Sequence, residues 1–175
     1  FKDLTKKIKL NLKPDIVIHC AGVNKSFDKS DNYKKNFDSN ILMVKNIINY
    51  SNENNVKKVF FLSSIDVYGL IKKKIISEKD IHNKSNYYGK SKLLSEKLIM
   101  DKNNFFKSIS LRIPGTLNYE FKKNQPLLMN IIQKIILRKE ISIFNPQNKF
   151  NNILDTYELF KILSFLIKKK IYKND

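Results

Sequence analysis

Residues 59–69, VFFLSSIDVYG, and residues 87–92, YYGKSK, decide the interpretation of this chain. The first stretch opens with a continuous apolar run, which is typical of a strand buried on both faces of a parallel sheet. The run leads directly into a pair of serines. The second stretch begins a helix on which Tyr88 and Lys92 lie one turn apart and face the same side. Together the two stretches predict a hydroxyl, a phenol and an ammonium around one small reacting group.

Spacing alone does not single out this tyrosine, because lysine is very frequent in the chain. A tyrosine followed four residues later by lysine occurs at four places, which are Tyr68, Tyr88, Tyr119 and Tyr157. Only Tyr88 opens a long helix after a strand that ends in serine. Context therefore selects Tyr88 and Lys92 as the functional pair.

The remaining segments alternate between strand and helix patterns. We expect strands at residues 16–19, 59–62, 109–113 and 141–144. We expect helices at residues 33–51, 86–101, 125–138 and 155–169, and the end of another at residues 1–12. Strands joined by helix-length crossovers predict an α/β fold with a doubly wound parallel sheet.

Ligands of an open parallel sheet bind beyond the carboxyl ends of its strands. Three such ends can be recognised here, at residues 19–22, at Ser63 and Ser64, and at residues 112–115. The candidate reactive residues therefore collect on one edge of the predicted sheet.

The residue types at this edge suit proton transfer. A free phenol titrates near pH 10, which is too high for base catalysis at neutral pH. A neighbouring ammonium favours the phenolate, so we expect Lys92 to lower the pKa of Tyr88. Ser64 would donate a hydrogen bond to a substrate oxygen on which charge develops.

At these residues the chain resembles the extended short-chain dehydrogenase/reductase family, which includes the nucleotide-sugar epimerases. Three further segments resemble that family: DIVIHCAG at residues 15–22, LRIPG at residues 111–115, and NKFNNILDTYELF at residues 148–160. The resemblance covers nearly the whole chain, and YGKSK after SSIDVYG is its most specific part. It implies a Rossmann-like fold, an NAD or NADP cofactor and a nucleotide-sugar substrate.

The resemblance also implies a role for each candidate residue. Tyr88, Lys92 and Ser64 would be catalytic, with Lys92 also holding the nicotinamide ribose. The cofactor would contact Ala21, Gly22, Ser63, Tyr88, Lys92 and Pro114. The substrate would contact Ser64, Asn40, Gly115, Phe150 and Asn151. No metal site is expected, and a homodimer through the helix bearing Tyr88 and the helix before it is possible.

The chain departs from the family in its glycines. The phosphate-binding pattern G-x-x-G-x-x-G does not occur among its four glycines, and the family carries that loop on its first strand. We therefore expect residues 1–114 to be the C-terminal part of a dinucleotide-binding domain without its first strands. Residues 115–175 would be a substrate-side segment with a returning helix, incomplete at its C-terminus. Such a fragment alone is expected to be inactive.

Other departures bear on the reaction. The 4,6-dehydratases carry an Asp-Glu pair where this chain has Ile65 and Asp66. The lack of an acid at Ile65 favours an epimerase or a keto-sugar reductase, because water elimination needs a second proton donor. The RIPG segment resembles family members found in cell-surface polysaccharide synthesis, which is an inference by analogy.

Composition limits the other possibilities. The chain has 175 residues and a net charge of +18, but Arg112 and Arg138 are the only arginines among 34 basic residues. A lysine excess without arginine indicates compositional bias rather than nucleic-acid recognition. Polar residues interrupt the longest apolar stretch, so we expect no membrane span. The single cysteine, Cys20, forms no intrachain disulfide and fits a cytoplasmic protein.

Two other functions stay open at this point. One is a non-catalytic dinucleotide-fold protein with a binding or regulatory role, which the intact set of Tyr88, Lys92 and Ser64 disfavours. The other is a lysine-rich nucleic-acid binder, for which binding would depend steeply on salt.

Overall fold

The structure, a computed structural model, describes residues 3–23, 32–69, 73–80, 85–117, 127–143 and 152–170. These residues fall into two units, unit 1 within Phe1–Arg112 and unit 2 within Ile113–Lys170.

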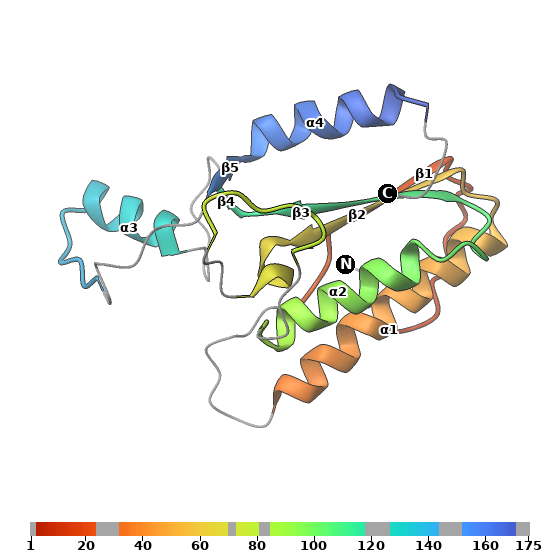
Figure 1. The fold of residues 1–175 in the computed structure, drawn as a ribbon, viewed down its shortest axis with the longest axis horizontal. Coiled ribbons are helices and arrows are strands. Elements are labelled where there is room, and N and C mark those ends of the chain that lie inside the picture. The colour runs from red at the N-terminus through yellow and green to blue at the C-terminus, as the bar shows by residue number, and fades with distance from the viewer. Residues whose placement is uncertain are drawn as a thin grey trace. The chain divides into compact units, whose positions relative to one another are not determined.

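Unit 1 is built on a three-stranded sheet in the order β1-β2-β3 (Figure 1). Its strands are β1 (Ile16–His19), β2 (Lys58–Ser64) and β3 (Lys107–Ile113), the last of which ends at the boundary between the units. β1 and β2 run parallel, with Ile16 opposite Lys58 and His19 opposite Phe61. The Lys107 amide donates to the Lys57 carbonyl at 3.0 Å, so β3 begins at the same end of the sheet as β2.

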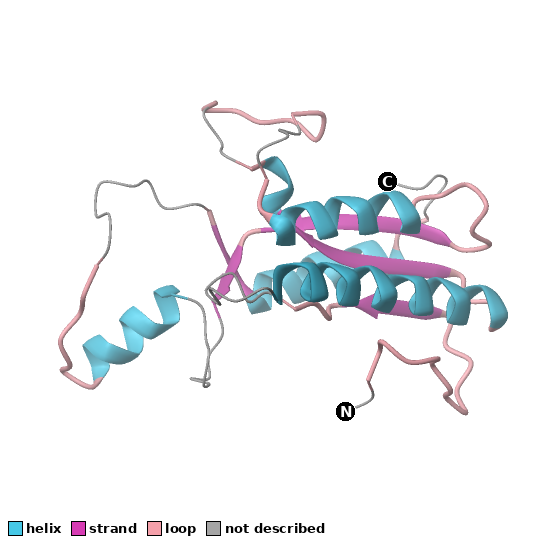
Figure 2. Cartoon of the chain, turned by 90° about the horizontal axis from the view of Figure 1, so that it is seen from below, coloured by secondary structure: helices cyan, strands magenta, loops and turns pink. Residues whose placement is uncertain are grey.

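Two helices cover one face of this sheet, as Figures 1 and 2 show from two directions. They are α1 (Asn32–Glu53), which follows β1, and α2 (Tyr87–Ile99), which follows β2 through a short 3-10 helix, η1 (Ile65–Tyr68). A hydrophobic core cluster of unit 1 is formed by Val44, Ile47, Val56, Val59, Phe61, Ile99 and Phe106. Unit 1 thus has the strand–helix alternation of one half of a doubly wound sheet.

Unit 2 contains a small parallel sheet of two strands, β4 (Gly115–Leu117) and β5 (Ile153–Asp155). Its helices are α3 (Leu127–Ile136) and α4 (Thr156–Lys168). Asp155 caps α4, because its carboxylate accepts a hydrogen bond from the Tyr157 amide at 2.7 Å. Within the described ranges, no helix combines the length and apolar character that crossing a bilayer requires.

The helix expected at residues 1–12 is wrong for the part that the structure describes. Residues 3–6 form a turn instead, in which the Asp3 carboxylate accepts from the Thr5 amide and the Asp3 carbonyl accepts from the Lys6 amide. A short polar side chain that binds the nearby backbone competes with helix formation.

The strands of unit 2 were also missed. Residues 141–143 form no strand, and Phe144 lies outside the described residues. The two strands that do form, β4 and β5, are three residues long and stabilise each other across a long sequence separation. Such a pairing leaves no periodic pattern in either segment, so the sequence did not indicate it. The other strands and helices are confirmed, with ends shifted by a few residues.

Candidate active site

The carboxyl end of β2 carries the two serines. Ser63 is buried, and Ser64 is half-buried. The Ser64 hydroxyl oxygen accepts a hydrogen bond from the Asp66 amide at 3.1 Å and so caps η1. This contact uses the oxygen as an acceptor, which leaves the Ser64 hydrogen available to donate.

Helix α2 begins against the turn that follows β2. Its cap is Asn86, whose side-chain oxygen accepts from the Gly89 amide at 2.7 Å. A Cβ atom added to Gly89 would lie 2.2 Å from the carbonyl oxygen of Asp66. Only glycine permits so close an approach of helix and turn. The sequence therefore brings the start of α2, and Tyr88 with it, to the carboxyl end of β2.

The Lys92 ammonium occupies the point where three segments meet. The Lys92 side chain is buried, with 3% of its surface exposed. Its Nζ donates to the Leu62 carbonyl at 2.8 Å and lies 5.6 Å from the centre of the Tyr88 ring. A Cβ atom on Gly22, just beyond β1, would lie 3.2 Å from that Nζ. The ends of β1 and β2 and the first turns of α2 thus converge on one ammonium.

Burial controls the pKa values of this pair. It lowers the pKa of Lys92 to about 8, against the attraction of Cys20 and Glu96. It raises the pKa of Tyr88 to about 12, and the charge of Asp66 adds to that increase. The prediction that Tyr88 has a lowered pKa is therefore wrong. The loss of water around the phenol disfavours its charged form.

Asn40 on α1 links the segment after β1 to α2. The side chain of Asn40 is buried, and its oxygen accepts from the Val23 amide at 2.8 Å. Its nitrogen donates to the Val23 carbonyl at 3.2 Å and to the Ser91 hydroxyl at 3.0 Å. Ser91 in turn donates to the Tyr88 carbonyl at 2.8 Å. Both amide hydrogens of Asn40 are thus used inside the protein.

Sequence reasoning did not find an ion pair behind the serines. The Ser63 hydroxyl donates to Glu96 at 2.5 Å, and Arg112 donates to the same carboxylate at 2.8 Å. Glu96 follows Lys92 by four residues on α2, so helical spacing could have placed it on the same face.

Within the part of the chain that it describes, the structure does not bring the other predicted site residues together with Lys92 as one group. Ala21 follows β1 in unit 1 next to Gly22, whereas Pro114 and Gly115 belong to unit 2. Phe150 and Asn151 lie outside the described residues.

The segment around Gly22 fits the nicotinamide end of a dinucleotide. A side chain at Gly22 would fill the space beside the Lys92 ammonium. A small backbone surface next to a cation suits the ribose hydroxyls, which can accept hydrogen bonds from the ammonium. Of the described residues, Ala21, Gly22, Tyr88 and Lys92 would hold this part of the cofactor.

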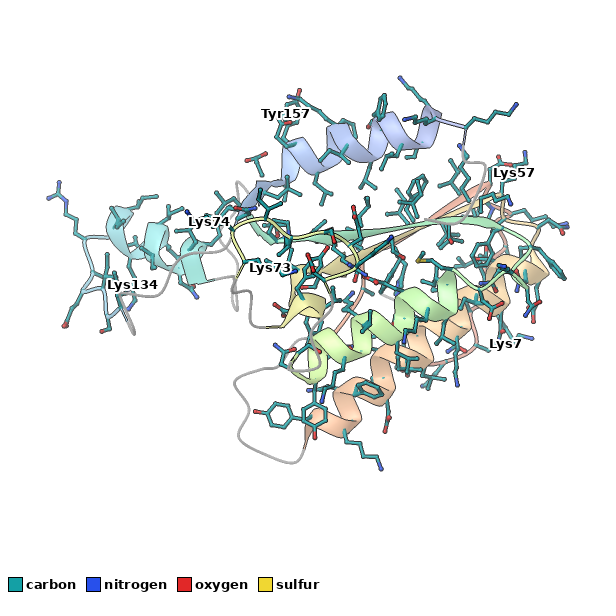
Figure 3. The ribbon with its side chains drawn as sticks, in the orientation of Figure 1. Lys7, Lys57, Lys73, Lys74, Lys134 and Tyr157 are labelled. Carbon is teal, nitrogen blue, oxygen red and sulfur yellow. The ribbon has the colours of Figure 1, made fainter. Side chains whose placement is uncertain are left out.

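A second tyrosine–lysine pair shows that spacing does not create this environment. Tyr157 projects outward from α4 and is 55% exposed (Figure 3). Lys161 lies over its ring at 4.6 Å from the centre, and the Lys161 ammonium donates to Glu158 at 2.7 Å. This pair forms a solvated helix surface.

Comparison with solved structures places the fold. UDP-glucose 4-epimerase from Thermotoga maritima, solved with UDP-glucose, has a TM-score of 0.81 at 17% identity, over 92% of this chain and 54% of that protein. RMD from Pseudomonas aeruginosa, complexed with NADPH, has a TM-score of 0.79 at 19% identity, over 94% of this chain and 62% of that protein. WbmG from Bordetella bronchiseptica, in complex with NAD and UDP, has a TM-score of 0.74 at 15% identity, over 91% of this chain and 48% of that protein.

At these identities the likeness establishes the Rossmann-like fold of the chain. The chain spans about half the length of these solved proteins. A curated relative, the RecBCD enzyme subunit RecB from Buchnera aphidicola, is 32% identical over 142 residues. That alignment covers 79% of this chain but only 12% of RecB, so it assigns no function.

The family comparison agrees with the fold. The model of the NAD dependent epimerase/dehydratase family matches residues 2–170, which is nearly the whole chain. The chain therefore belongs to the NAD dependent epimerase/dehydratase family.

Proposed function

We propose that the protein carrying this chain catalyses the epimerisation or keto-reduction of a nucleotide-activated sugar with NAD or NADP. The observation that carries this proposal is the position of the buried Lys92 ammonium, 5.6 Å from the Tyr88 ring centre and beside Gly22. The bound molecules of the three structural neighbours support it, since these are UDP-glucose, NAD with UDP, and NADPH.

Tyr88 would exchange a proton with the reacting sugar oxygen. When bound, the nicotinamide cofactor supplies or accepts the hydride. A phenol whose pKa is about 12 keeps its proton at neutral pH, so Tyr88 carries the proton that it would donate. Proton donation to a developing alkoxide is the step that keto-reduction requires. Epimerisation additionally requires Tyr88 to remove a proton, which its raised pKa opposes.

Lys92 and Ser64 would stabilise the charge that this transfer creates. The Lys92 ammonium, 5.6 Å from the centre of the Tyr88 ring, would favour the phenolate that donation leaves behind. The Ser64 hydroxyl can donate to the sugar oxygen while its own oxygen accepts from Asp66. Asn40 would hold the segment beside the cofactor rather than touch the sugar, because its amide hydrogens bind Val23 and Ser91.

We propose the same division of labour along the chain as the sequence suggested. Residues 1–114 would serve the cofactor side, and residues 115–175, with Gly115, Phe150 and Asn151, the substrate side. Pro114 would contact the cofactor. The RIPG segment supports a role in cell-surface polysaccharide synthesis in the cytoplasm.

A homodimer is also part of the proposal. Of the α2 leucines and isoleucines, Ile99 belongs to the core and Leu98 packs against it. Leu94, by contrast, is exposed. An exposed apolar residue on α2 supports pairing of this helix with a second copy, which sedimentation measurements would detect.

In the direct experiment, the purified full-length protein that carries this chain is incubated with NAD or NADPH and individual nucleotide sugars. Nicotinamide absorbance reports keto-reduction, and chromatography of the sugar reports epimerisation. A protein that binds the cofactor but converts none of the sugars would be the non-catalytic alternative. Binding to arbitrary DNA that weakens steeply with salt would favour the nucleic-acid alternative.

A further inference from the structure

Helix α2 is attached to the end of β2 at two successive residues of the strand. Lys92 donates to the Leu62 carbonyl at 2.8 Å, and one turn later Glu96 accepts from the Ser63 hydroxyl at 2.5 Å. Both contacts are buried. The first contact belongs to the proposed catalytic pair, whereas nothing in the proposed chemistry requires the second.

The second contact is reinforced by a buried ion pair. Glu96 is 4% exposed and receives two charged donors from Arg112 on β3, Nη2 at 2.8 Å and Nε at 3.0 Å. The same guanidinium lies 4.9 Å from the centre of the Tyr68 ring and donates to the Glu78 carbonyl at 2.8 Å. The bond to Glu96 raises the pKa of Arg112, so the guanidinium stays charged. Glu96 is therefore a fixed acceptor for Ser63.

Stability alone does not account for this arrangement. A buried ion pair often contributes no more to folding than apolar residues of the same volume would. The ion pair can also orient the strand end, because successive side chains of a strand point to opposite faces. Tying Ser63 to α2 fixes the direction of its neighbour Ser64, whose hydroxyl donates to no group among the residues that the structure describes.

We propose that Glu96 is a positioning residue: with Arg112 as its counter-ion it holds Ser63 and thereby aims the Ser64 hydroxyl at the sugar oxygen. This inference rests on the proposed function, in which Ser64 contacts the substrate. It adds Glu96 and Arg112 to the site as residues that act through the serines.

The test replaces Ser63, because loss of Glu96 would leave a buried guanidinium unpaired and could unfold the protein. Ser63→Ala removes the hydroxyl that binds Glu96, and titration with the cofactor checks separately whether the cofactor contact expected of Ser63 is lost with it. The matched control is Ser95→Ala, since the Ser95 hydroxyl is equally buried, lies on α2 and has no hydrogen-bond partner among the described residues. Ser63→Thr keeps the hydroxyl. Turnover and amide hydrogen exchange across residues 62–66 are measured for all three.

We expect Ser63→Ala to lower kcat about tenfold with little change in KM, as a small misplacement of a reacting group does. Ser63→Thr restores most of the turnover, and Ser95→Ala leaves kcat unchanged. Exchange across residues 62–66 accelerates in Ser63→Ala alone. Equal kcat in Ser63→Ala and the unsubstituted protein, or equal losses in both alanine variants, overturns the inference.

Failure of the proposed function is distinguishable from failure of this inference. If the unsubstituted protein converts no nucleotide sugar, the proposed function fails, and hydrogen exchange then decides whether Glu96 orders the strand end. Unchanged exchange across residues 62–66 in Ser63→Ala would overturn the inference even then.

Discussion

The Lys92 ammonium donates a 2.8 Å hydrogen bond to the carbonyl oxygen of Leu62, the residue just before the two serines of β2. This bond joins α2 to the strand end and holds a cation at the edge of a parallel sheet, the edge at which such sheets bind ligands. The Lys92 side chain is buried at this position, and burial lowers its pKa to about 8.

Turnover should fall as pH rises past about 8, because Lys92 then loses the proton that makes it a cation. The pH profile of kcat/KM for keto-reduction measures this alkaline limb. Lys92→Met should be nearly inactive across the whole range. A profile that stays flat to the ordinary lysine pKa of 10.5 would show that the Lys92 charge is not needed.

Gly89→Ala should strongly destabilise the protein. The added Cβ would lie 2.2 Å from the Asp66 carbonyl oxygen, so α2 or η1 must move at a cost of about 1–3 kcal/mol. Urea denaturation measures the loss. Gly115→Ala is the matched control, because a Cβ there has no atom within 4 Å. Equal stability of the two variants would mean that α2 does not pack tightly on η1.

Asn40→Ala should weaken cofactor binding by about tenfold, since the segment at Val23 loses two hydrogen bonds that fix it beside Lys92. Calorimetric titration with the cofactor measures the change. Asn46→Ala, on the same helix, also loses two bonds to backbone carbonyls, those of Leu4 and Lys6. That control should bind the cofactor normally, and equal weakening in both variants would contradict the assigned role.

His19 should make the protein sensitive to acid. The imidazole is buried against the Phe61 ring, and burial lowers its pKa from 6.5 to about 4, with Lys92 adding to the effect. Between these pH values the unfolded chain binds a proton that the folded chain does not. The free energy of unfolding should therefore decrease by up to about 3 kcal/mol as pH falls through this window.

Denaturant titrations at several pH values test this against His19→Phe, which keeps an aromatic ring next to Phe61. The variant should lose much of the pH dependence between 6.5 and about 4. The same slope in both proteins would assign the acid sensitivity to other groups.

Local patterns in the sequence were sufficient to predict part of this site. The apolar run before Ser63 and the spacing of Tyr88 and Lys92 predicted a strand, a helix and their order, because each depends on neighbouring residues. The family and the Rossmann-like fold followed from the same segments, and both are confirmed.

Contacts between distant segments could not be inferred in this way. The bond from Lys92 to Leu62, the fit of Gly89 against Asp66 and the partners of Glu96 exist only after α2 docks. The pKa of Tyr88 was predicted in the wrong direction for the same reason, since proximity to a lysine is readable from spacing and burial is not.

The central claim is that Tyr88 transfers the proton, and one pair of variants tests it most directly. Tyr88→Phe removes the phenol oxygen from the ring that lies near Lys92, whereas Tyr157→Phe removes it from the exposed pair with Lys161. Turnover of a nucleotide sugar should fall at least a thousandfold, on the order of 4 kcal/mol, in Tyr88→Phe alone, with cofactor binding retained. Turnover that persists in Tyr88→Phe at the level of Tyr157→Phe would contradict the account.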